Sequence, residues 1–105
     1  MLRIYWVMLD AIEIMQPLID QIRAHNRGLA TQTDEASSSV PLNIAEGSGN
    51  RGGTRRERYN TALGSARETV ACLHTAERKR YIPPIPPDLM AKMDHVIGVL
   101  VINTR

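Results

Sequence analysis

Apolar residues recur every three or four positions along four stretches of the chain, which is the spacing of one face of an α-helix. The first stretch covers residues 2 to about 25. Its expected buried face is Leu2, Tyr5, Leu9, Ile12, Met15 or Gln16, Ile19, and Ile22 or Arg23. Pro17 is expected to end or kink this helix, because it removes a backbone donor and clashes with the preceding turn. A turn is predicted at residues 25–28, where Gly28 can take the left-handed conformation that ends a helix.

Two further helices are expected on either side of a glycine-rich loop at residues 47–53. The earlier one runs from about Leu29 to Gly47, with Pro41 in its interior at a cost of roughly 3 kcal/mol in helix propensity. The later one begins at Thr54, because Thr54 and Glu57 have the spacing of a capping box, and it extends to about residue 81. The expected face of the earlier helix is Leu29, Gln32 or Thr33, Ala36, Val40, Ile44 or Asn43, and Gly47. That of the later helix is Tyr59, Ala62, Leu63, Ala66, Val70, Leu73, and Ala76 or Glu77.

A proline-rich connector at residues 82–87 precedes the last helix, which starts at Pro87 or Asp88. The face of this helix is expected to be Leu89, Met93, Val96 with Ile97, Leu100 and Val101. No stretch alternates as a strand would. Four helices joined by short links predict an all-α, up-down-up-down antiparallel four-helix bundle that forms a single domain over residues 1–105.

Composition narrows the class of protein. Only 4% of residues are aromatic and none is Phe, so the core must be aliphatic. Cys72 is the only cysteine, which excludes a disulfide within one chain and a cysteine-rich zinc site, and a reducing cytoplasm is the expected location. The apolar run from Ile4 to Leu9 is too short to span a membrane, so we expect the mature start of a soluble protein.

Charge is distributed unevenly along the chain. The net charge is −3 over residues 1–50, +5 over residues 51–80 and zero over residues 81–105. The arginines Arg51, Arg55, Arg56 and Arg58 cluster where the glycine-rich loop opens a helix. Free backbone N–H groups at a helix start and bidentate guanidinium groups both favour phosphate. These four arginines are the candidate nucleic-acid contacts, and the alternative is a solvated helix start partly neutralised by Glu57.

Four polar side chains are expected to meet near the loop. Asn43 and Glu46 lie three apart on one helix, and Ser65 and Glu68 lie three apart on the next. A hydrogen-bonded structural network is the favoured interpretation, and acid–base chemistry or a magnesium site is the alternative. Two carboxylates without a histidine make a poor transition-metal site, so neither a metal nor another cofactor is predicted.

One pair of residues permits an enzymatic interpretation. Arg67 and His74 are seven apart, two turns along one helical face. The pair resembles the active-site motif of HEPN-type ribonucleases, in which the His would act in acid–base catalysis. The alternative is a hydrogen-bonded structural histidine. No catalytic residue is therefore assigned, and the glycine-rich loop lacks the lysine and the preceding strand of a P-loop.

Two longer motifs carry a family resemblance. Gln32, the run Ser39-Val40-Pro41-Leu42-Asn43-Ile44-Ala45-Glu46-Gly47-Ser48-Gly49 and the run Ala62-Leu63-Gly64-Ser65-Ala66-Arg67-Glu68 resemble those of the 23S rRNA intervening-sequence proteins. That family is related to the accessory variability determinant proteins of diversity-generating retroelements. In one place this chain departs from the pattern, because Thr33-Asp34-Glu35 stands where many relatives carry a basic residue.

The resemblance implies a four-helix bundle that assembles into a ring, with pentamers known in the family. It also implies RNA or DNA binding, and in the retroelement relatives a reverse transcriptase as partner. The resulting hypothesis is a non-enzymatic, cytoplasmic homo-oligomer that binds nucleic-acid phosphates. A protein–protein adaptor without nucleic-acid binding is the alternative from a different class.

Overall fold

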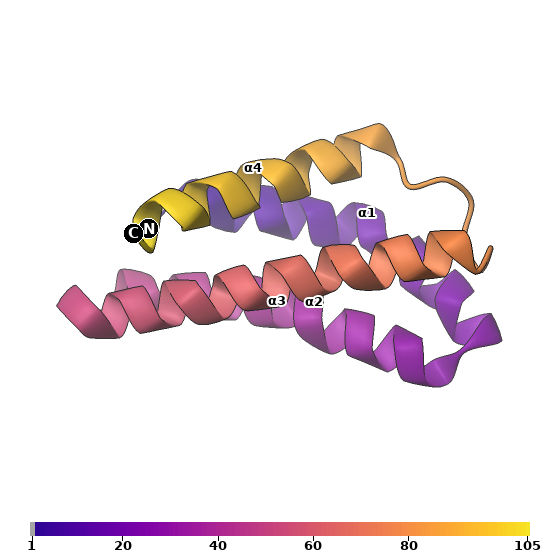
Figure 1. Cartoon of the computed structure of the whole chain (residues 1–105), viewed down its shortest axis with the longest axis horizontal. Helices are drawn as coiled ribbons and strands as arrows, with labels where there is room; N and C mark the ends of the chain where they lie inside the picture. Colours follow the sequence, from indigo (N-terminus) through magenta and orange to yellow (C-terminus); the bar gives the residue numbers. More distant parts are fainter. Residues whose placement is uncertain (1) are drawn as a thin grey trace.

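The computed structural model describes residues 2–105, and within them it contains four helices and no strand. The helices are α1 (Ile4–His25), α2 (Arg27–Ser48), α3 (Gly52–Arg78) and α4 (Pro87–Asn103). Each packs against its neighbours in sequence, and α1 also packs against α4. The all-α, up-down-up-down bundle predicted from the sequence is confirmed. The loop between α2 and α3 lies at the same end as both chain termini, and the other two connections lie at the opposite end (Figure 1).

The core is aliphatic, as the composition predicts, and Tyr59 is the one aromatic residue among the buried side chains described. On α4 the predicted Leu89, Met93, Val96 and Leu100 are buried, and the predicted Ile97 and Val101 are half-buried. The buried face in the first half of α1 is turned by one position from the predicted one. The side chains buried there are Ile4, Met8, Ala11 and Met15, and the predicted Leu2, Tyr5, Leu9 and Ile12 are half-buried. Apolar side chains occupy residues 4–9 almost without interruption, so their period alone does not fix which side faces inward.

The turn between α1 and α2 differs from the prediction. Gly28 lies inside α2, and the chain reverses at Asn26, which has an extended backbone (φ −155°, ψ 99°). The Asn26 side chain accepts a hydrogen bond from the Leu29 backbone N–H at 2.9 Å and so caps α2. The cap makes a glycine turn unnecessary and joins the two helices through a single residue.

The start of α3 also differs, because no capping box forms at Thr54. The helix begins two residues earlier, after Arg51, and Gly52 takes a positive φ of 60°. Glycine adopts this conformation without steric cost, so the helix can start inside the loop.

The third helix ends at Arg78, three residues before the predicted end. Arg80 has a positive φ of 62°, the Tyr81 N–H donates to the Ala76 carbonyl at 2.9 Å and the Arg80 N–H donates to the Glu77 carbonyl at 2.9 Å. These bonds form a Schellman motif, which satisfies carbonyls left free at the helix end.

The two internal prolines do not end their helices. Both α1 and α2 continue through Pro17 and Pro41, and Pro41 is buried. Termination at Pro17 is therefore excluded, since α1 reaches His25.

Candidate nucleic-acid interface

The four candidate arginines lie at the end of the bundle that also holds the chain termini (Figure 1). Arg51 and Arg56 are exposed, and among the described residues neither makes an ion pair or a side-chain hydrogen bond. Arg58 pairs with Glu46 on α2, with Nη2 and Oε1 3.2 Å apart. Both side chains of this pair are about half exposed, so it is worth at most about 1 kcal/mol. A phosphate can displace the Glu46 carboxylate at little cost.

Arg55 is fixed in a way that its neighbours are not. Its Nε donates to the Asn50 carbonyl at 2.9 Å and to the Gly47 carbonyl at 3.3 Å. The Gly47 carbonyl is among the last of α2, where carbonyls carry partial negative charge, and it also accepts a hydrogen bond from the Asn50 backbone N–H at 3.1 Å. The guanidinium is thereby oriented, while its terminal Nη groups make no hydrogen bond or ion pair within residues 2–105. An oriented guanidinium with free terminal donors suits a phosphate, because less side-chain entropy is lost on binding.

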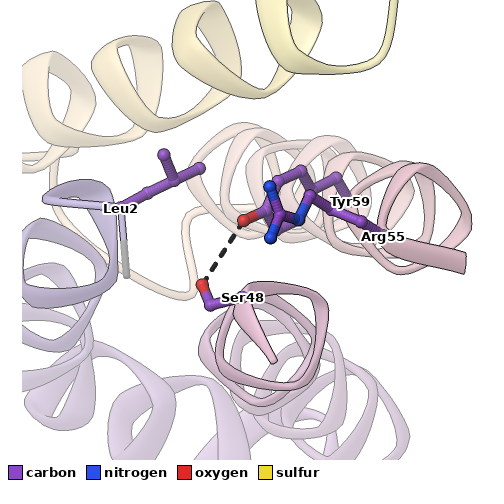
Figure 2. A pocket seen from close by; sticks show the side chains of 4 residues that line it. All are labelled: Leu2, Ser48, Arg55 and Tyr59. Carbon is purple, nitrogen blue, oxygen red and sulfur yellow. Dashed lines mark hydrogen bonds between the residues drawn. The ribbon is translucent and has the colours of Figure 1, made fainter. Parts of the chain in front are cut away.

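Arg55 borders a hollow of about 180 Å³ that Leu2, Ser48 and Tyr59 complete (Figure 2). The Ser48 and Tyr59 hydroxyl oxygens are 3.3 Å apart. Ser48 Oγ also donates to the Ile44 carbonyl at 2.8 Å, so its single proton is committed and Tyr59 is the donor in the pair. The hollow is open to solvent and has room for a small polar group.

A close approach of α2 and α3 shapes this hollow. A Cβ atom at Gly47 would lie 2.6 Å from Cε1 of Tyr59 and 3.1 Å from Cβ of Arg58. Gly47 is therefore the residue that lets the Tyr59 ring lie flush against α2. The same approach sets α3 in place, and with it Arg55 and Arg58.

The four predicted polar residues are distributed over three separate sets of contacts. Asn43 Nδ2 donates to the carbonyl and the Oγ of Ser39, at 2.9 and 3.0 Å, and Ser65 Oγ donates to the same Ser39 Oγ at 2.8 Å. Glu46 pairs with Arg58, as described above. Farther along the bundle, Gln32 Nε2 donates to Glu68 Oε2 at 3.3 Å. The contacts tie α2 to α3 at three levels. Ser39, which belongs to the family motif but was not included in the predicted polar network, connects the middle set.

The remaining sequence candidates lie on the surface. Arg67 and His74 are both exposed on α3, and no hydrogen bond joins either one to another described side chain. The alternative of a buried, hydrogen-bonded His74 is wrong. Within residues 2–105, no three His, Cys, Asp or Glu side chains are grouped so that they could hold a metal ion. In the same residues, no helix is long and apolar enough to cross a membrane.

Cys72 is buried between α3 and α2. Burial raises the pKa of its thiol above the ordinary value of 9.0. A hydrogen bond with Thr33 lowers the pKa, and the Glu68 carboxylate raises it further. A thiol held neutral in this way is a poor nucleophile.

We expect Cys72 to react with iodoacetamide about tenfold or more slowly in the folded protein than in urea, because labelling requires local opening. Because the pKa of the thiol is higher in the folded state, the thiol favours the folded state at pH values below its pKa in the unfolded chain. This contribution to stability is lost as the pH rises above about 9. Mass spectrometry at several pH values from 7 to 10 measures the labelling rate. Equal rates in the folded and unfolded protein would show that the thiol is accessible.

The comparison with protein families concerns nearly the whole length of the chain. The family model described as 23S rRNA-intervening sequence protein matches residues 7–101. No curated protein sequence matches, and no solved structure does. The matched range includes all four candidate arginines and the residues that position them, apart from Leu2.

Proposed function

The chain belongs to the 23S rRNA-intervening sequence protein family, and from that premise we propose that it binds the phosphate backbone of RNA or DNA without catalysing a reaction. The contacts are Arg51, Arg55, Arg56 and Arg58. The observation that carries the proposal is the anchored guanidinium of Arg55, with the unpaired Arg51 and Arg56 on either side. Phosphate contacts of this kind position a nucleic acid without reading its sequence.

Self-association would strengthen such a surface. Trp6, Leu42 and Ile102 are large apolar side chains that are each more than 60% exposed, and contacts between copies of the chain would remove this apolar surface from water. We propose that copies of the chain associate into a closed ring, of which a pentamer is one form. The surface formed by the four arginines would then be repeated around the symmetry axis. Repetition raises the affinity for a long strand without any new kind of contact. A reducing compartment such as the cytoplasm suits the buried free thiol.

A titration of labelled RNA and duplex DNA at about 50 and 200 mM salt tests the proposal, with the mass of the protein measured by light scattering. Four phosphate contacts predict an affinity that falls about 50- to 150-fold over this range, since each contact contributes 0.7–0.9 to the logarithmic salt slope. The RNA should be recovered at full length.

Two results would contradict the proposal. Absence of salt-sensitive binding to both nucleic acids would favour a protein–protein adaptor. RNA cleavage without a metal, abolished by His74→Ala, would favour the ribonuclease alternative instead.

A further inference from the structure

Two aromatic rings are stacked at the end of the bundle opposite Arg51, Arg55, Arg56 and Arg58. The rings of His25 and Tyr81 lie 5.0 Å apart between centroids and only 7° from parallel. His25 is the last residue of α1, and Tyr81 follows the end of α3. The rings come from distant parts of the chain, and they meet because both helix ends lie at this end of the bundle (Figure 1).

The stack has a buried side and a solvent side. Tyr81 is half-buried and packs against the hydrophobic core, whereas His25 is exposed. The left-handed Arg80 in the Schellman motif turns the chain so that Tyr81 lies beside α1. This conformation costs a non-glycine residue about 1 kcal/mol, so the packing of Tyr81 must hold it in place. The core therefore fixes the position of an exposed imidazole ring.

Five exposed cations lie within three residues of His25 or Tyr81 in the sequence, at the same end of the bundle. They are Arg23, Arg27, Arg78, Lys79 and Arg80. The Lys79 ammonium lies 6.0 Å from the centroid of the Tyr81 ring.

Residues 20–28 and 77–88, which form this end of the bundle, hold three carboxylates against five cations, and each carboxylate is already engaged. Asp20 pairs with Arg23 at 3.3 Å, and Glu77 accepts a hydrogen bond from the Ile85 N–H at 2.8 Å. Asp88, in the first turn of α4, accepts a hydrogen bond from the Leu89 N–H at 3.0 Å. An excess of positive charge remains around the exposed imidazole.

Helix dipoles explain only part of this cluster. Arg23 and Arg78 lie in the last turns of α1 and α3, where cations are stabilising. Arg27 is the first residue of α2, where a cation is unfavourable. The dipoles also give no reason for two stacked rings at the centre of the cluster.

We propose that this end of the bundle binds single-stranded nucleic acid, with an unpaired base stacked on the outer face of His25 and Arg27, Lys79 and Arg80 on the adjacent phosphates. An aromatic ring among cations is the combination that single-strand binding surfaces use. The ligand class rests on the proposed function, but the two surfaces share no residue. Paired bases have no free face to offer, so the surface discriminates against duplex.

The test compares a fluorescent 12-nucleotide RNA strand with the corresponding 12-base-pair duplex. His25→Ala is expected to weaken binding of the single strand about 5- to 150-fold, the usual effect of losing one stacked base, and to leave duplex binding within about twofold. His25→Trp should restore single-strand binding. His95→Ala removes another exposed histidine, on α4, and should leave both affinities unchanged.

Arg80→Gly provides a second variant that should fold well. It removes one cation and supplies the residue that best tolerates a positive φ. We expect weaker single-strand binding by about five- to tenfold, with a salt slope flatter by about 0.7.

The inference would be overturned if His25→Ala left the affinity for the single strand unchanged. It would also be overturned if His25→Ala lowered the affinities for single strand and duplex equally. A variant in which Arg51, Arg55, Arg56 and Arg58 are all replaced by alanine separates this inference from the proposed function. If that variant binds duplex normally while His25→Ala loses single-strand binding, the proposed function of the four arginines fails and the inference about His25 stands. If the fourfold variant loses duplex binding while His25→Ala keeps its single-strand affinity, the inference about His25 is rejected and the proposed function of the four arginines is supported.

Discussion

Replacing Arg51, Arg55, Arg56 and Arg58 together with alanine is expected to lower duplex affinity about a thousandfold at 0.1 M salt. Each phosphate contact contributes about 0.7–0.9 to the slope of log affinity against log salt concentration. Because the logarithm of 0.1 M is −1, each contact contributes the same amount to the logarithm of the affinity at this salt concentration. Four lost contacts should therefore flatten the slope by about 3. Fluorescence anisotropy with a labelled duplex at four salt concentrations measures both quantities. Circular dichroism should show an intact fold, since these side chains are mostly exposed.

A double variant, Arg67→Ala with Lys92→Ala, serves as the control for a change in overall charge. Both residues lie away from the four arginines, since Arg67 is near the middle of α3 and Lys92 is in the half of α4 nearer the opposite end of the bundle. Their loss should change the slope by less than about 1. If the control variant and the fourfold variant lose similar affinity, binding depends on net charge and the arginines form no defined surface.

Gly47→Ala is expected to destabilise the protein by about 1–3 kcal/mol, although alanine is the better helix former. The new methyl group would lie 2.6 Å from a ring carbon of Tyr59, which is only 4% exposed and has little room to move. The helices must separate or the ring must shift. Urea unfolding followed by circular dichroism measures the change in the free energy of unfolding.

Gly64→Ala is the matched control, because it places the same methyl group in α3 with no atom within 4 Å. Here the higher helix propensity of alanine acts alone and should stabilise the protein by about 1 kcal/mol. The two substitutions are thus expected to have opposite signs. A Gly47→Ala variant as stable as Gly64→Ala would show that α2 and α3 do not approach closely at Tyr59.

The sequence predicted the fold because the apolar period is visible in all four helices. The helix ends were predicted less well, because they depend on single local contacts. Asn26 caps α2 by its side chain, and a left-handed Arg80 closes α3 where a glycine would be the usual residue. Neither contact belongs to a periodic pattern, so neither was anticipated.

In the candidate site, too, some features could be predicted from the sequence and others could not. The arginines are visible as a cluster in the sequence, whereas the anchoring of Arg55 and the pairing of Ser48 with Tyr59 are not. These contacts depend on the register between α2 and α3, and spacing within one helix does not encode that register. The stack of His25 on Tyr81 is harder still to predict, because it joins two helix ends that are not consecutive in the chain.

The single-residue connection at Asn26 also bears on how the protein folds. With one residue between α1 and α2 and three between α2 and α3, most contacts form between segments close in sequence. Low contact order of this kind is associated with folding in microseconds to milliseconds. The contacts of Arg55, Arg58 and Tyr59 with α2 all lie within the α2–α3 hairpin. Local unfolding of α4 would therefore leave Arg55 and Arg58 in place on the α2–α3 hairpin.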